Sequence, residues 1–167
     1  MVTRNSGATR ELLAALVNKD GTFLDIGCAT GYLMECLQVW ARERGHSLIM
    51  YGLELSPALV AAARQRTPAL ASHIFEGNVL DWVPPRRFTF VHTGLEYVPV
   101  NRQSWLVRHL VDEFVEPGGR LIVGPIPHAD LPANREAFEA AGAPPEASEY
   151  TDHTGKTRYV LWSRTRA

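Results

Sequence analysis

A chain of 167 residues, 46% of them hydrophobic and 21% charged, has the composition of a globular protein that buries one core. Its net charge of −1 excludes a strong electrostatic attraction to nucleic acid or to an anionic membrane, and no apolar run approaches the roughly 18 residues of a membrane span. Two cysteines, Cys28 and Cys36, are too few for a disulfide framework and lack the spacing of a metal site. Because residues 1–7 also lack the apolar core of a signal peptide, we expect a cytoplasmic protein.

The first half of the chain alternates predicted helices with short apolar runs. Ser56 as an N-cap and Pro57 at the first helical position mark one helix start. Helices are expected at residues 9–17, 32–44 and 57–66. Strands are expected at residues 23–26, 47–53 and 73–76.

The second half continues this alternation and ends in a hairpin. Strands are expected at residues 88–92, 120–124, 146–152 and 157–164, and helices at residues 101–116 and 133–141. Pro117-Gly118-Gly119 should end the long helix, and three prolines predict a loop over residues 124–132. Strands that alternate with helices predict an α/β protein with a largely parallel sheet and helices on both faces. The last two strands read as an antiparallel hairpin that turns at Thr154-Gly155.

A glycine turn follows the first predicted strand, where a parallel sheet binds nucleotide-like ligands. A dinucleotide fingerprint from Gly27 would need glycine at 29 and glycine or alanine at 32, but the chain has Ala29 and Tyr32. A phosphate-binding loop would need a lysine, and none lies between residues 20 and 156. The remaining pattern is Asp25-x-Gly27-x-x-x-Gly31, in which the acid repels phosphate and suits a ligand with an amino group.

This pattern resembles the first motif of class I S-adenosylmethionine-dependent methyltransferases, with Ala29 at the position of the central glycine. The resemblance extends over residues 9–164. It implies a single domain over residues 1–167, a three-layer sandwich with a seven-stranded, mostly parallel Rossmann-like sheet and an antiparallel C-terminal hairpin. The implied cofactor is S-adenosyl-L-methionine. The residues of the first motif that would bind it are Asp25, Gly27, Cys28, Ala29 and Gly31.

The end of the second predicted strand supplies a candidate for the ribose. Glu54 lies 29 residues after Asp25, and an acid beyond a glycine turn commonly accepts the ribose hydroxyls of an adenosine. The alternative is an exposed carboxylate at the end of a strand. In the family, the residue after this acid flanks the adenine, and here it is Leu55.

Residues 77–81 resemble the family's third motif, which binds adenine. The resemblance assigns the adenine to the Asn78 side chain and the backbone N–H of Val79, with Asp81 as the rival for the exocyclic amine. The alternative for Asn78 is a turn after the third strand.

Residues 88–98 resemble the fourth motif, so His92 and Thr93 are expected beside the reactive sulfonium. A free imidazole with a pKa near neutrality makes His92 a candidate general base. The alternative is a histidine that fixes the loop through hydrogen bonds. Glu96 and Tyr97 would either contact substrate or cap the loop. No ligand spacing supports a metal site, so no metal is expected.

The resemblance implies methyl transfer to an oxygen, nitrogen or carbon nucleophile that the sequence does not identify. A non-catalytic module that keeps the fold and the pocket is the alternative, and Ala29 and Tyr32 disfavour a nicotinamide oxidoreductase. Only residues 1–8 precede the first predicted helix, so no separate lid domain is expected. Three explanations are open for the short N-terminal segment without a lid: a bulky substrate that closes the site itself, the second subunit of a homodimer, or a shortened chain. Arg4 and Arg10 are candidates to hold the methionine carboxylate.

Overall fold

The computed structural model describes the backbone of residues 7–166 and the side chains of residues 12–166. Its strands are β1 (Gly21–Ile26), β2 (Leu48–Glu54), β3 (Ile74–Glu76), β4 (Phe88–Thr93), β5 (Val115–Pro127), β6 (Glu146–Thr151) and β7 (Thr157–Arg164). Its helices are α1 (Gly7–Leu16), α2 (Tyr32–Glu43), α3 (Pro57–Arg66), α4 (Val100–Glu113) and α5 (Leu131–Ala140), with short 3-10 helices η2 (Pro68–His73) and η3 (His128–Asp130). None of the helices between residues 7 and 166 is long and apolar enough to cross a bilayer.

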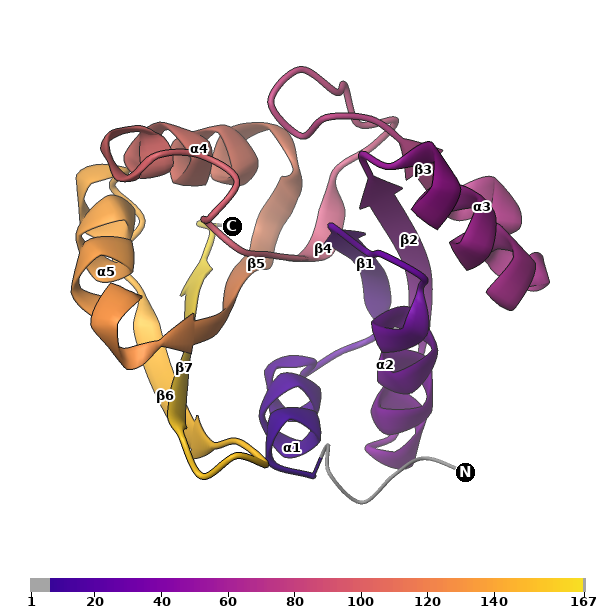
Figure 1. Cartoon of the computed structure of the whole chain (residues 1–167), viewed down its shortest axis with the longest axis horizontal. Helices are drawn as coiled ribbons and strands as arrows, with labels where there is room; N and C mark the ends of the chain where they lie inside the picture. Colours follow the sequence, from indigo (N-terminus) through magenta and orange to yellow (C-terminus); the bar gives the residue numbers. More distant parts are fainter. Residues whose placement is uncertain (1–6, 167) are drawn as a thin grey trace.

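In this part of the chain, seven strands form one sheet in the order β3-β2-β1-β4-β5-β7-β6. Strands β1 to β5 pair in parallel, whereas β7 is antiparallel to β5 and β6 is antiparallel to β7. The predicted fold is therefore confirmed, including the antiparallel C-terminal hairpin (Figure 1).

Two hydrophobic layers cover the two faces of the sheet. Leu24 and Val91 pack with Leu106 and Phe138 on the face that α4 and α5 cover. Phe23 and Phe90, which neighbour these residues along β1 and β4, point the other way and belong to the core beneath α1, α2 and α3. Figure 1 shows this division, with α1, α2 and α3 grouped apart from α4 and α5. Because both faces are covered, the central strands are buried almost throughout, as parallel strands are.

The fifth strand differs from its prediction. It extends over Val115–Pro127 rather than residues 120–124, and α4 ends at Glu113. Two shifts of register explain why its prolines and glycines do not end it. One lies between Phe88 and Phe90 on the neighbouring β4, opposite Pro117-Gly118-Gly119, and the other lies within β5 between Val123 and Ile126, around Pro125. At such irregularities proline loses no ladder hydrogen bond, so the strand continues past both.

The order of the strands determines where a ligand can bind. Along the sheet, β2 and β3 lie to one side of β1, and β4 and β5 lie to the other. The connections leaving β1 and β4 therefore diverge, which opens a crevice at the carboxyl ends of these two strands. The glycine turn leaves β1 at this point, and the segment 94–99 leaves β4 beside it.

Candidate functional site

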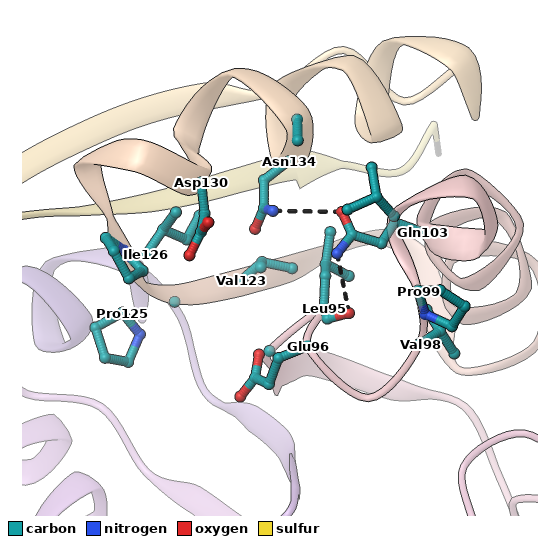
Figure 2. A pocket seen from close by; sticks show the side chains of 15 residues that line it. Leu95, Glu96, Val98, Pro99, Gln103, Val123, Pro125, Ile126, Asp130 and Asn134 are labelled. Carbon is teal, nitrogen blue, oxygen red and sulfur yellow. Dashed lines mark hydrogen bonds between the residues drawn. The ribbon is translucent and has the colours of Figure 1, made fainter.

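Three adjoining cavities lie along the carboxyl ends of β1, β2, β4 and β5. The Glu54 cavity, of about 330 Å³, includes Glu54, Leu55, Asn78 and Val79 in its wall. The His92 cavity, of about 270 Å³, includes Asp25, Cys28, Ala29, His92 and Thr93. The Asn134 cavity, also of about 270 Å³, includes Gln103, Asp130 and Asn134 (Figure 2).

These cavities are neighbours, because residues in their walls are shared. Gly27 and Tyr97 line both the Glu54 cavity and the His92 cavity. Glu96 and Pro125 line both the His92 cavity and the Asn134 cavity. Gly31 and Asp81, two of the predicted cofactor residues, line neither the Glu54 cavity nor the His92 cavity.

The glycine turn has the left-handed backbone that its glycines predict. Gly27 and Gly31 have φ values of 76° and 75°, and a Cβ on Gly27 would collide with the hydroxyl of Tyr97. Ala29 also has a positive φ, of 48°, where an L-residue costs roughly 1–2 kcal/mol. The alanine therefore adopts the conformation that the family's central glycine would adopt freely. The backbone N–H of Ala29 donates to Glu54 Oε2 at 3.0 Å, which stabilises the turn.

Glu54 is tied to backbone amides on both of its oxygens. Its Oε1 accepts a hydrogen bond from the N–H of Ser56 at 3.0 Å, and its Oε2 accepts the one from Ala29. Each carboxylate oxygen can accept a further hydrogen bond, so the side chain is oriented and still able to bind hydroxyl groups. Leu55 lies next to it at the rim of the cavity, with 65% of its surface exposed.

At the other wall of the Glu54 cavity, Asn78 makes the turn that was the alternative to adenine binding. Its Oδ1 accepts the backbone N–H of Leu80 at 3.1 Å. Val79 is buried and its carbonyl lies 3.3 Å from His109 Nε2. Asp81 is exposed. Asn78 and Val79 line the cavity, so their predicted contacts with adenine stay predictions. Asp81 does not line it, so its position does not support the alternative that Asp81 binds the exocyclic amine of adenine.

Asp25 and His92 form a buried pair in the wall of the His92 cavity. They are register partners across β1 and β4, with His92 Nδ1 2.9 Å from Asp25 Oδ1. The other ring nitrogen, Nε2, lies 2.9 Å from the carbonyl oxygen of Gly124. An ionised carboxylate and a carbonyl can only accept hydrogen bonds, so His92 satisfies both as a doubly protonated imidazolium.

The environment of His92 supports this charge state. Burial by itself lowers the pKa of His92, but the hydrogen bond and negative charge of Asp25 and the carbonyl of Gly124 outweigh burial and raise the pKa above its ordinary value. An imidazolium with both N–H groups engaged has no lone pair for the proton of a nucleophile. The geometry therefore disfavours the predicted role of His92 as a general base and favours the alternative of a residue that fixes the site.

Two further groups in the His92 cavity are held in their protonated, neutral forms. Burial, and then the charges of Asp25 and Glu54, raise the pKa of the Cys28 thiol to about 12. Burial, followed by the charges of Glu96, Asp25 and Glu54, raises the pKa of Tyr97 to about 12. Cys28 is thus a small buried side chain rather than a nucleophile.

The sequence predictions did not include Gln103 and Asn134, which meet in the wall of the Asn134 cavity. Both are buried polar residues with 6% of their surface exposed. The sequence does contain a signal for Asn134. Asn134 precedes Ala137 and Phe138 by three and four residues, so a polar side chain occupies a core position of an amphipathic helix.

Two remaining predictions concern a metal site and the arginines near the N-terminus. Within the described residues, no cluster of three or more histidines, cysteines or carboxylates could hold a metal ion. Arg4 and the side chain of Arg10 lie outside the described residues, so their predicted contact with a methionine carboxylate stays a prediction.

Comparison with known proteins gives matches in sequence and in structure, and methyltransferases are among both. No protein-family model matches the chain. It is 30% identical over 125 residues to trans-aconitate 2-methyltransferase of Methylobacterium nodulans. This alignment covers 75% of this chain and 46% of the relative. It is 27% identical over 113 residues to carboxy-S-adenosyl-L-methionine synthase of Wolinella succinogenes, covering 66% and 46%. The chain thus spans about half the length of these curated relatives.

The solved structures that match cover nearly the whole chain. DesVI of Streptomyces venezuelae superimposes with a TM-score of 0.69 at 18% identity, over 98% of this chain and 91% of its own. Geranyl diphosphate C-methyltransferase of Streptomyces coelicolor, solved with S-adenosyl-L-homocysteine, gives 0.65 at 18% identity over 95% and 78%. The [4+2]-cyclase SpnF gives 0.69 at 15% identity, covering 95% and 81%. The sequence is similar to that of a methyltransferase and the fold is similar to that of a solved methyltransferase, in agreement with the predicted resemblance to the class I S-adenosylmethionine-dependent methyltransferases.

Proposed function

We propose that this protein binds S-adenosyl-L-methionine across the Glu54 and His92 cavities and transfers its methyl group to an acceptor in the Asn134 cavity. The observation that supports this most is the shared walls of the three cavities at the crevice between β1 and β4. A ligand that extends from Glu54 to Thr93 ends beside the wall that the His92 and Asn134 cavities have in common.

The residues present fit this cofactor. The absence of a side chain at Gly27 leaves room for the hydroxyl of Tyr97, and both residues lie in the wall that the first two cavities share. The carboxylate of Glu54 is oriented by two amides and can accept ribose hydroxyls, and Leu53, Leu55 and Val79 offer apolar surface for a base. Glu54 and Glu96 bring negative charge to the walls, which suits a sulfonium and an ammonium group better than a phosphate.

When bound, S-adenosyl-L-methionine supplies an electrophilic methyl group on sulfur. The protein's contribution is to hold donor and acceptor in line, because proximity and orientation lower the barrier most in such a displacement. His92 and Asp25 hold the ends of β1 and β4 together beneath the reacting groups, since the pair bridges the two strands and His92 also contacts the Gly124 carbonyl of β5. A proton acceptor is needed only if the methyl acceptor is bound in its protonated form.

Calorimetric titration with S-adenosyl-L-homocysteine and with NAD in parallel tests the cofactor. We expect S-adenosyl-L-homocysteine to bind and NAD not to bind measurably. At a ligand concentration one hundred times the Kd, stabilisation of about 2.7 kcal/mol should also raise the melting temperature. Tight NAD binding, or no stabilisation by millimolar S-adenosyl-L-homocysteine, would contradict the proposal.

A non-catalytic module with the same pocket remains the second candidate, because binding alone does not demonstrate transfer. The cyclase among the structural matches shows that proteins with this fold are named for other activities. Mass spectrometry for S-adenosyl-L-homocysteine and for a methylated product separates the two candidates. The acceptor, a homodimeric assembly and a cytoplasmic location are parts of the proposal that need their own measurements, and trans-aconitate should be among the acceptors tried.

A further inference from the structure

The Asn134 cavity presents hydrogen-bond acceptors of fixed orientation. A chain of hydrogen bonds begins at the backbone carbonyl of Leu95, which can only accept, so Gln103 must turn its Nε2 toward it, at 3.2 Å. Gln103 Oε1 then faces Asn134 and accepts from its Nδ2 at 3.4 Å. The backbone carbonyl thereby determines the orientation of both amides, and Asn134 Oδ1 must point away from Gln103.

This oxygen is aimed into the cavity and lacks a partner. Figure 2 shows Asn134 Oδ1 on the side of Asp130, away from the dashed bond to Gln103. No described residue donates a hydrogen bond to it, although Asn134 is only 6% exposed. No fully enclosed side-chain oxygen in the described part of the chain lacks a partner, so this one reaches the open space of the cavity. An acceptor that faces the cavity in this way is available to a ligand that donates a hydrogen bond.

The charges of the cavity have one sign. Glu96 and Asp130 are the charged side chains among the described residues of its wall, and both are carboxylates. Val98, Val123 and Ile126 supply apolar surface between them. A ligand with a carboxylate would face two like charges and find no donor in Asn134 Oδ1, whereas an ammonium group would match all three groups.

We propose that the methyl acceptor is a small amine that enters the Asn134 cavity as a cation. One of its N–H groups donates a hydrogen bond to Asn134 Oδ1. This rests on the proposed function and names its substrate class. The ammonium first loses a proton to water or to one of the two carboxylates. The nitrogen lone pair then forms the bond to the methyl carbon while the carbon–sulfur bond breaks, and its electron pair stays on sulfur. The products are a methylated ammonium and neutral S-adenosyl-L-homocysteine.

Two pairs with the same ring and opposite charge test this: benzylamine with benzoate, and cyclohexylamine with cyclohexanecarboxylate. Each probe is titrated at up to millimolar concentration into the full chain saturated with S-adenosyl-L-homocysteine. We expect each amine to bind at least tenfold more tightly than its carboxylate. With S-adenosyl-L-methionine in place of the product, mass spectrometry should detect a methylated amine.

Variants tie the preference to the cavity. Asp130→Asn, an exposed residue outside the Glu54 and His92 cavities, should weaken amine binding about tenfold and leave the affinity for S-adenosyl-L-homocysteine unchanged. Asn134→Leu should weaken it similarly, with circular dichroism as the check on folding. The matched control is the double variant Glu136→Gln/Glu139→Gln, which removes two exposed carboxylates from α5, the helix that follows Asp130 and carries Asn134. Amine binding by this variant should stay within twofold of wild type.

Carboxylates that bind as well as amines, the absence of binding by either class, or amine binding unchanged in Asp130→Asn would each overturn the acceptor proposal. In these cases the titration with S-adenosyl-L-homocysteine still reports on the cofactor site. A protein that fails to bind S-adenosyl-L-homocysteine loses the proposed function, and the acceptor proposal with it.

Discussion

Replacing His92 with alanine tests whether this residue stabilises the site or performs chemistry. The change leaves Asp25, which is 3% exposed, as a buried charge without its partner. Removing one member of a buried ion pair typically costs about 3–5 kcal/mol, against a total stability of about 5–15 kcal/mol for a protein domain. For a chain of this size, the melting temperature should fall by roughly 6–20 °C. The matched control is His153→Ala, an exposed histidine in the terminal hairpin, which should change stability by less than about 0.5 kcal/mol.

The pH dependence gives this prediction a second, independent arm. The pKa of His92 in the folded protein lies above the ordinary value of about 6.5 expected in the unfolded chain. The native state therefore keeps a proton that the unfolded state releases, so the stabilisation by His92 is complete below about pH 6.5. It is lost as the pH rises through the folded pKa. The stability difference between wild type and His92→Ala should thus shrink toward alkaline pH.

Urea denaturation at intervals between mildly acidic and alkaline pH measures both effects. The reasoning would be refuted by a cost below about 1 kcal/mol at neutral pH, or by a difference that does not vary with pH. Once an acceptor is found, the rate adds a further check. A folded His92→Ala protein that transfers methyl at the normal rate would exclude the base role.

Three further predictions concern the glycine turn and its surroundings. Glu54→Ala should weaken binding of S-adenosyl-L-homocysteine ten- to a hundredfold, or about 1.5–3 kcal/mol, and unchanged affinity in calorimetry would place the ribose elsewhere. Ala29→Gly should stabilise the protein by up to about 1 kcal/mol in urea denaturation, because relief of a positive φ outweighs the entropy of an added glycine, and a loss of stability would contradict that φ. Cys28, with a pKa raised to about 12, should react slowly with iodoacetamide at pH 8 in the native protein and quickly in urea, and peptide mass spectrometry showing fast native alkylation would be the contrary result.

Local patterns in the sequence predicted most of the fold, because strand, turn and helix signals lie close together along the chain. The glycine turn after β1 and the helix start at Ser56-Pro57 depend on neighbouring residues alone, and both occur where expected. The length of β5 does not depend on local signals. Pro117 and Pro125 lie at shifts of register against β4 and β7, and those shifts exist only once the strands have paired.

The site was predicted less completely, and the reason is again pairing at a distance. Asp25 and His92 were each assigned to the pocket, but their contact depends on the register between β1 and β4, which no local pattern contains. The interpretation of His92 as a free imidazole was therefore not supported by the structure. Gln103 and Asn134 come from two helices that meet only in the folded protein.

The segment 94–99 has a consequence for how the proposed cofactor and the proposed acceptor affect one another. Its residues contribute to all three cavities, with Tyr97 facing the Glu54 and His92 cavities and Glu96 facing the His92 and Asn134 cavities. A ligand that moves this segment in one cavity would also change the shape of the others. Binding at the two ends would then be thermodynamically coupled, and the coupling would be reciprocal: whatever factor the cofactor adds to the affinity for the acceptor, the acceptor adds to the affinity for the cofactor.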